Sequence, residues 1–296
     1  MQKKNIGIFS ILFASIMWSV EPIFAKLSYE TADFLQTSAI RALGAILVAG
    51  FYIILTNKPR VVFEKKEMYP LVYIALMGTL VADVLYFLAL TQIQVVNAVV
   101  IAHMQPIFII LFSFLFLKSD KLSLFDYFGI LFMMLSAILV TTRSLDNLFS
   151  LQFGTLGDLF VLSATIVWST TAIVMRRYLV HMHAGCITLY RFFIAFLFFI
   201  PYLVFISDLS TVNLYQMLVG IVVGLGTIFY YEGLKRITAA QASGLELSTP
   251  FFATLLAFVI LGELVSLLQG IGILLLLVGI ACFVKREQSI QGGGNE

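Results

Sequence analysis

Residues 11–26 read ILFASIMWSVEPIFAK, and residues 161–176 read VLSATIVWSTTAIVMR. Both stretches place a Trp-Ser pair inside an apolar run, and the two tryptophans, Trp18 and Trp168, are 150 residues apart. In each half the next apolar run carries one arginine, at the same offset of 150 residues. Self-similarity at a constant offset indicates that the fold is built from a repeat.

The correspondence extends well beyond the tryptophans. The two arginines at the offset of 150 are Arg41 and Arg191. At an offset of 144 residues, Tyr86, Leu90, Ile93, Ala98 and Pro106 recur as Tyr230, Leu234, Ile237, Ala242 and Pro250. The duplication therefore covers several consecutive apolar runs in each half of the chain.

The composition indicates an integral membrane protein. Hydrophobic residues make up 61% of the 296 positions and charged residues 11%, whereas soluble domains carry roughly 45–50% and about 25%. No soluble fold of this length could bury so much apolar surface. The basic residues are scattered in pairs between apolar runs, which argues against a nucleic-acid partner. Cys186 and Cys282 lie far apart in such runs and predict no disulfide framework.

Ten apolar runs are long enough to be membrane-spanning helices, which need about 20 residues each. They cover 6–28, 34–56, 69–91, 95–117, 122–141, 156–178, 184–206, 213–235, 239–261 and 266–284. None shows the alternating pattern of a β-barrel strand, so the predicted class is an all-α integral membrane protein. We interpret the first run as a retained helix, because its counterpart in the second half cannot be a signal peptide.

The predicted organisation is a five-helix repeat over 6–141, a second over 156–284, and a disordered cytoplasmic tail over 285–296. Because five is odd, the second repeat enters the membrane from the opposite side and is inverted. Of the 18 lysines and arginines, two lie inside runs, Lys26 and Arg143 lie on the side away from the termini, and the remaining fourteen lie on the side of the termini. This asymmetry predicts that both termini are cytoplasmic and that the membrane is the cytoplasmic membrane.

These features resemble the drug/metabolite transporter superfamily, and within it the EamA-type ten-helix transporters. The motifs that carry the resemblance are the Trp-Ser step, the arginine in the second run, the mid-helix proline and a Leu-Gly-Glu end at 261–263. The first half departs from the pattern with Lys-Ser-Asp at 118–120, and with Glu-Pro at 21–22 where an uncharged pair is usual. The resemblance implies a transporter of small metabolites, often an amino-acid exporter, with a central cavity between the repeats.

Ionisable side chains inside the runs are the primary candidates for function, because each costs at least about 2.5–3.5 kcal/mol to place in a bilayer. Counting residues from the predicted helix ends puts four of them in one layer, roughly 10–12 Å below the outer surface. These four are Glu21, Arg41, Asp83 and His103. Arg191 and Glu246 form a mirrored layer at a similar depth below the inner surface.

We interpret the two layers as gates. Arg41 would pair with Glu21 or Asp83 when the outer side closes. Arg191 would pair with Glu246 when the inner side closes. The outer layer has one carboxylate more than it has fixed cations, and a spare carboxylate in low dielectric takes up a proton or a cationic amine. The alternative is that the same pairs only lock helices together.

Other residues allow a functional and a structural interpretation. Cavity wall and ordinary core packing are both open for four aromatic residues inside the runs: Trp18, Tyr86, Trp168 and Tyr230. His103 is a proton relay or a satisfied hydrogen-bonding residue, and its isolation argues against a metal. Pro106 and Pro250 predict a bend at matching positions, as hinges or static kinks. Gly220 and Gly224 form a small-xxx-small face that allows close helix contact.

The sequence predicts no enzyme, cofactor or metal site, because it has no Gly-rich phosphate loop, no nucleophile–base set and no HExxH-like pair. The predicted function is a secondary active transporter, an exporter of amino acids or related small metabolites by alternating access. The alternatives are a proton-coupled antiporter of organic cations or drugs, a non-transporting scaffold subunit, and an intramembrane hydrolase, which the missing nucleophile argues against. The expected partners are a small-molecule substrate, membrane lipid and a coupling proton, and the chain is a monomer or a homodimer.

Overall fold

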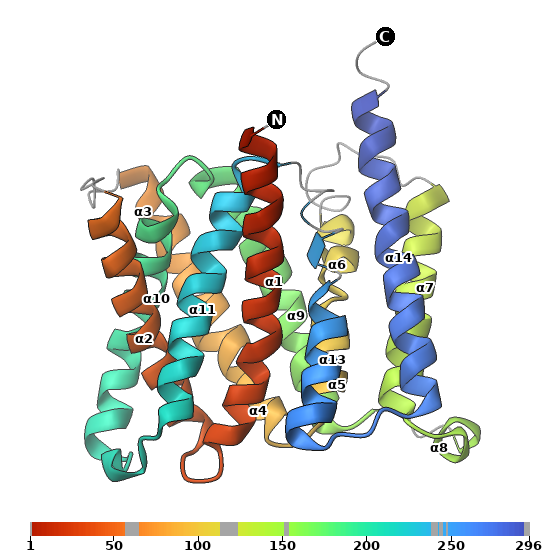
Figure 1. The fold of residues 1–296 in the computed structure, drawn as a ribbon, viewed down its shortest axis with the longest axis horizontal. Coiled ribbons are helices and arrows are strands. Elements are labelled where there is room, and N and C mark those ends of the chain that lie inside the picture. Colours follow the sequence, from red (N-terminus) through yellow and green to blue (C-terminus); the bar gives the residue numbers. More distant parts are fainter. Residues whose placement is uncertain are drawn as a thin grey trace.

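A computed structural model of the chain describes residues 2–56, 65–112, 124–150, 154–237, 242, 245–246 and 248–292. Every regular element in this part of the chain is a helix. The long helices run roughly parallel to one axis, and α1 begins at the same end of the bundle at which α14 ends (Figure 1). We refer to this end as the terminal end and to the other as the loop end.

The elements and their bounds are α1 (Gln2–Ser28), α2 (Phe34–Leu55), α3 (Lys65–Tyr73), η1 (Ile74–Asp83), α4 (Val84–Leu90), α5 (Val95–Ala102), α6 (Gln105–Phe112), α7 (Leu124–Thr142), α8 (Leu145–Phe149), α9 (Leu156–Val174), η3 (Met175–Leu179), α10 (Ala184–Phe205), η4 (Leu209–Thr211), α11 (Leu214–Leu234), α13 (Ser248–Leu261) and α14 (Leu267–Gly292). Of these, η1 and η3 are π-helices and η4 is a 3₁₀-helix.

Seven helical stretches are long and apolar enough to cross a bilayer, and they coincide with predicted runs. They are Lys4–Ser28, Phe34–Leu55, Lys65–Leu90, Val95–Phe112, Leu156–Leu179, Ala184–Phe205 and Leu214–Leu234. Three shorter apolar helices, Tyr127–Thr142, Ser248–Leu261 and Leu267–Cys282, fall in the remaining runs. The prediction of a membrane-type all-α fold is confirmed.

The helices differ from the predicted runs in three places. The third stretch contains the π-helix η1, and the fourth is broken between α5 and α6. The helix α14 continues to Gly292, so most of the segment predicted as a disordered tail is helical, while 293–296 lie outside the described residues. The predicted ends at 113–117, 122–123 and 239–241 also lie outside them.

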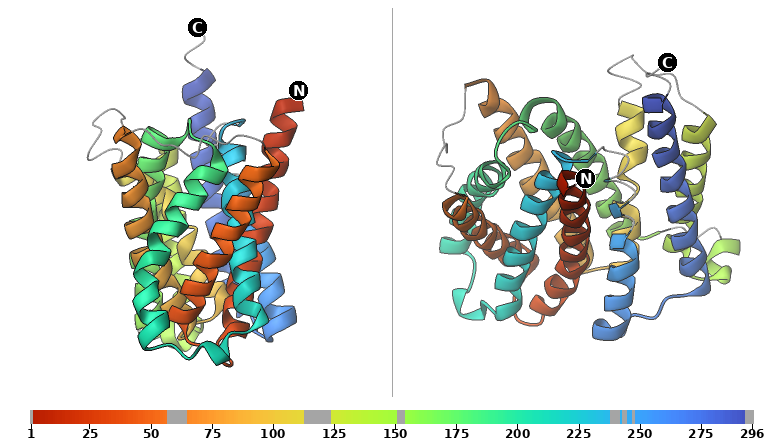
Figure 2. Two further views of the ribbon diagram at one scale, coloured as in Figure 1. Left: turned by 90° about the vertical axis from the view of Figure 1, so that its left-hand side faces the viewer. Right: turned by 45° about the horizontal axis from the view of Figure 1, so that its top comes forward.

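The packing joins elements from the two halves of the chain. The helix α1 packs against α11 and α13, and α9 packs against η1, α4, α5 and α6. The helix α2 lies between α10 and α11. The helices α7 and α14 form a pair at one side of the bundle (Figures 1 and 2).

The contact between α2 and α11 depends on glycines. A Cβ atom at Gly44 would lie 2.8 Å from the Cα of Gly220, and one at Gly220 would lie 2.9 Å from the Arg41 carbonyl oxygen. A Cβ at Gly224 would lie 2.9 Å from the side chain of Val48. The small-xxx-small face predicted at Gly220 and Gly224 is therefore a close helix contact, and it brings the backbone of α11 against the turn of α2 that carries Arg41.

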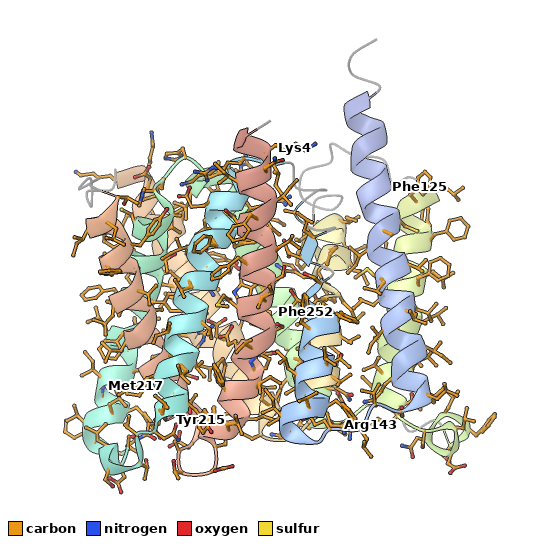
Figure 3. The ribbon with its side chains drawn as sticks, viewed as in Figure 1. Lys4, Phe125, Arg143, Tyr215, Met217 and Phe252 are labelled. Carbon is orange, nitrogen blue, oxygen red and sulfur yellow. The ribbon has the colours of Figure 1, made fainter. Side chains whose placement is uncertain are left out.

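The loop end is closed by hydrogen bonds between side chains at the helix ends. Gln216 Nε2 donates to Gln36 Oε1 at 3.2 Å and to Thr37 Oγ1 at 3.3 Å. Asn97 Nδ2 donates to Asp158 Oδ1 at 3.0 Å. Figure 3 shows Arg143 and Tyr215 at this end and Lys4 at the opposite one. These bonds join α2 to α11 and α5 to α9, which closes the bundle below the cavity described next.

Candidate functional site

A cavity of about 230 Å³ lies between helices from both halves of the chain. All ten residues that the sequence predicts as substrate or gating residues line it: Trp18, Glu21, Arg41, Asp83, Tyr86, His103, Trp168, Arg191, Tyr230 and Glu246. Of the two predicted hinge residues, Pro106 lines the cavity, whereas Pro250 is buried in α13 beside the lining residue Thr249. Their roles in transport stay predictions.

Arg41 is the centre of a buried ion-pair network. Its Nε donates to Glu21 Oε1 at 2.6 Å and its Nη1 to Asp83 Oδ2 at 2.7 Å. All three side chains are buried. The rings of Phe87 and Phe192 lie 5.0 and 5.4 Å from the guanidinium carbon, which adds cation–π attraction. Arg41 therefore contacts both predicted carboxylate partners at once.

Arg191 reaches the same network from the second half of the chain. Its Nη2 lies 3.3 Å from Asp83 Oδ2, and its Nε donates to Thr79 Oγ1 at 3.0 Å. The expected Arg191–Glu246 pair is not among the ion pairs between described residues. The prediction counted depth at the Cα atom, but the long side chain of Arg191 extends past that layer to the carboxylate of Asp83.

This contact also changes the charge balance. With Arg191 included, the network holds two arginines and two carboxylates, Glu21 and Asp83, so the spare outer carboxylate inferred from the sequence has a cation beside it. The two gate layers are joined into one network in this structure. A buried network of this kind is costly to break from one side, because the partner left behind is an uncompensated buried charge.

Two aromatic pairs join the halves at the cavity wall. The rings of Trp18 and Tyr230 are 4.8 Å apart, and those of Tyr86 and Trp168 are 5.3 Å apart. The two pairs are equivalent under the repeat. Trp168 Nε1 also donates to Asp83 Oδ1 at 2.8 Å, so one pair is tied directly to the ion-pair network.

Glu246 forms a second acidic centre on the cavity. The Tyr230 hydroxyl donates a hydrogen bond to its carboxylate, and Arg176 lies close enough to attract it. Arg176 lines the cavity and is exposed near the end of η3, at the terminal end of the bundle. The cavity therefore reaches exposed surface on that side. The sequence analysis had placed Arg176 in a connection and missed it as a site residue.

His103 lies where the fourth membrane helix is broken. Its Nδ1 is 2.7 Å from the Val99 carbonyl oxygen. Since a carbonyl only accepts, Nδ1 carries a proton and Nε2 is the remaining nitrogen for other contacts. Pro106 has no N–H to donate to the carbonyl of Ala102, a residue that also lines the cavity. The break leaves a backbone acceptor at the cavity.

The repeat offers a signal for two further lining residues. Thr171 is the repeat partner of Glu21, and Thr227 is the repeat partner of Asp83 at the offset of 144. Both threonines line the cavity. The sequence analysis did not single out Thr227. The π-helix η1, which ends at Asp83, was also missed, and π-turns occur frequently at functional sites.

Within the described ranges, no group of three or more His, Cys, Asp or Glu side chains is placed to hold a metal ion. The cavity instead combines charged pairs, aromatic rings and hydroxyl groups. Such a lining suits a small polar molecule that carries charge.

The sequence matches the EamA-like transporter family over residues 5–142 and 155–285. These two segments correspond to the two halves defined by the internal repeat. A crystal structure superposes on the fold with a TM-score of 0.70 at 20% identity, covering 96% of this chain and 98% of that one. The helical arrangement is therefore one that a known protein adopts along almost its whole length.

Several similar proteins are named as transporters. The uncharacterized transporter sll1164 of Synechocystis sp. is 28% identical over 230 residues, which is 73% of this chain and 65% of that protein. The uncharacterized transporter YetK of Bacillus subtilis is 21% identical over 97% of this chain and 89% of its own length. The pseudopaline exporter CntI of Pseudomonas aeruginosa is 27% identical over 54% of this chain and 55% of its own. The chain thus spans just under two thirds of sll1164 and about half of CntI.

Proposed function

Since this chain is a multi-pass membrane protein that belongs to the EamA-like transporter family, we propose that it is a secondary active transporter of the cytoplasmic membrane. It exports amino acids or related small metabolites by alternating access. The observation that carries the proposal is the single cavity in which buried charges from both halves of the chain meet. The ten helices form two inverted five-helix repeats.

Reciprocal packing supports the inverted repeat. The contacts of α1 with α11 and α13 correspond to those of its repeat partner α9 with η1 and α4 and with α5 and α6. The helix α2 packs against its own repeat partner α10, and α7 against α14. Exchange of the two halves reproduces this contact pattern, as expected for halves related by a two-fold axis.

The orientation follows from the charges at the two ends. Lys4, Arg177 and Lys235 lie in helix ends or connections of the terminal end, whereas Lys26 and Arg143 lie at the loop end. By the positive-inside rule the terminal end is cytoplasmic. The cavity reaches exposed surface at the terminal end, so the state described here is open to the cytoplasm and closed on the outer side. An exporter loads its cargo in this state.

Transport by the purified full chain tests the proposal. Proteoliposomes loaded with a panel of L-amino acids, amines and organic acids are assayed for efflux with and without an imposed proton gradient. We expect efflux of one chemical class at a rate above that of empty liposomes and above that of the Arg41→Gln variant. Absence of transport of every compound, in a preparation that is monodisperse and correctly folded, contradicts the proposal and favours a scaffold subunit.

A second candidate is a proton-coupled antiporter of organic cations or drugs. It is favoured by Glu246, a carboxylate hydrogen-bonded to Tyr230, whose ring packs against Trp18. A carboxylate beside aromatic rings is a suitable site for an organic cation. In the same assay, efflux of amines alone, driven by protons entering on the opposite side, identifies this function.

A further inference from the structure

The longest contacts in the cavity network are those between Arg191 and Asp83. Arg191 Nη2 lies 3.3 and 3.4 Å from the two carboxylate oxygens of Asp83. Those oxygens already accept shorter bonds, from Arg41 Nη1 at 2.7 Å and from Trp168 Nε1 at 2.8 Å. Charge-assisted N–H···O bonds are typically about 2.7–2.9 Å long, so Arg191 is the weakly held member of the network.

Arg191 is also the more accessible arginine. Its side chain is 16% exposed, compared with 5% for Arg41 and 2% for Asp83. The space beside it is left open by Gly78, where a Cβ atom would lie 3.3 Å from Arg191 Nη2 and 3.5 Å from Thr171 Cγ2. A ligand in the cavity can therefore reach the guanidinium without displacing the Arg41 pairs.

The repeat explains why Arg191 is weakly held. Arg41 has two carboxylates, Glu21 and Asp83, from its own half of the chain. The repeat partners of those two residues are Thr171 and Thr227, which are uncharged. Arg191 therefore has no carboxylate at the equivalent positions of its own half and depends on Asp83 of the other half.

The charges of the network define what can separate this contact. If a ligand carboxylate binds Arg191, the remaining cluster of Arg41, Glu21 and Asp83 holds one cation and two anions. A buried excess charge of that kind is strongly unfavourable unless a cation compensates it. An ammonium group on the same ligand supplies that cation. A carboxylate has about four acceptor positions, so Asp83 can accept from an ammonium while it keeps the bonds from Arg41 and Trp168.

Resting on the transport function proposed above, we propose that the Arg191–Asp83 contact is the cargo-binding site, at which Arg191 binds a carboxylate and Asp83 an ammonium group of one zwitterionic molecule. The ligand exchanges one long internal contact for two intermolecular ion pairs, and the network stays neutral. An amine alone would leave Arg191 uncompensated. A carboxylic acid alone would leave the Glu21–Asp83 side with an excess negative charge.

Binding to the purified full chain in lipid nanodiscs tests this assignment by calorimetric titration with the standard L-amino acids. The amino acid that binds most tightly is then compared with its own decarboxylated amine and its own deaminated acid. We expect the zwitterion to bind about ten- to a hundredfold more tightly than either, because each analogue loses one charged hydrogen-bonded contact. No measurable binding of any amino acid, or equal binding of the amine or the acid, overturns the assignment.

Two variants identify the residue that binds the carboxylate. Arg191→Gln is expected to lower zwitterion affinity about ten- to a hundredfold and to leave amine binding within about threefold, which also shows that the variant is folded. Arg177→Gln is the matched control, since this exposed arginine of η3 stacks on Tyr178 and does not line the cavity. Unchanged zwitterion affinity in Arg191→Gln, or an equal loss in Arg177→Gln, overturns the assignment.

The failure of this inference is distinguishable from the failure of the proposed function. Zwitterion binding that depends on Arg191, without efflux from proteoliposomes, supports the binding site and contradicts the transport function. Efflux of compounds that lack either the carboxylate or the ammonium group, at rates equal to those of zwitterions, supports the transport function and overturns the binding site.

Discussion

Asp83 accepts hydrogen bonds from arginines of both halves of the chain, from Arg41 Nη1 at 2.7 Å and from Arg191 Nη2 at 3.3 Å. One side chain at the end of the π-helix η1 thereby joins α2 to α10. The inequality of the two distances separates a structural contact from an exchangeable one. We expect substitutions on the two arginines to differ accordingly, the first in stability and the second in ligand binding.

Arg41→Gln is expected to destabilise the folded protein by about 3–5 kcal/mol, because two buried carboxylates lose their common partner. Thermal unfolding in detergent, followed by tryptophan fluorescence, measures the change. Lys26→Gln is the control, since Lys26 pairs with Glu263 at 2.8 Å but its side chain is 22% exposed, so its loss is expected to cost about 1 kcal/mol or less. Equal losses for the two variants contradict the assigned importance of burial.

Trp168→Phe is expected to lower the transport rate about tenfold, because the ring remains but the N–H that donates to Asp83 Oδ1 is lost. Trp18→Phe, at the equivalent position of the first repeat, is the matched comparison and is expected to have a smaller effect. Its ring packs against Tyr230 in the same manner as that of Trp168 against Tyr86. Efflux rates of the two variants in proteoliposomes decide the matter, and a larger effect at Trp18 contradicts it.

Pro106→Ala is expected to slow transport more than Pro250→Ala. Restoring the N–H at Pro106 allows a bond to the Ala102 carbonyl and favours a continuous helix across the break between α5 and α6. Pro250 lies within the described helix α13, close to its first residue, where a proline is tolerated. Efflux assays of both variants, with hydrogen exchange of residues 102–106, measure the effect. The reverse order would assign the hinge to α13.

Glu246→Gln is expected to remove the dependence of transport on a proton gradient if the second candidate function holds, because the carboxylate beside Tyr230 can then no longer exchange a proton. Glu21→Gln is the comparison, and it is expected to act mainly on stability through Arg41. Efflux measured at a series of internal and external pH values separates these effects. An unchanged pH dependence in both variants ends the proton-coupling hypothesis for these carboxylates.

Gly220→Val is expected to destabilise the protein by several kcal/mol or to prevent its assembly, because a Cβ atom would lie 2.9 Å from the Arg41 carbonyl oxygen. Gly50→Ala in the neighbouring helix is the control, since nothing lies within 4 Å of its Cβ position. That change is expected to be neutral or to stabilise the helix by up to about 1 kcal/mol. The yield of monodisperse protein and its unfolding temperature check both expectations.

The internal repeat allowed much of the fold and site to be predicted, because hydropathy follows directly from the bilayer and equivalent positions gather around one axis. The ten cavity residues were found in this way. The partner of Arg191 was not predictable, since residue counting locates a Cα atom and not the end of a long side chain. The π-helix before Asp83 and the break at His103 also depend on packing against α9, for which the sequence carries no local pattern beyond Pro106.

The amide bonds at the loop end, such as that between Gln216 and Gln36, have a consequence for how the outer side opens. Water can replace each of them, so parting these helix ends costs only about 0.5–1.5 kcal/mol per bond. An apolar seal would instead have to hydrate its whole contact surface. The outer seal therefore behaves like a wettable clasp, whose strength is adjusted one side chain at a time: leucine at Gln216 would hold it shut, and alanine there would loosen it.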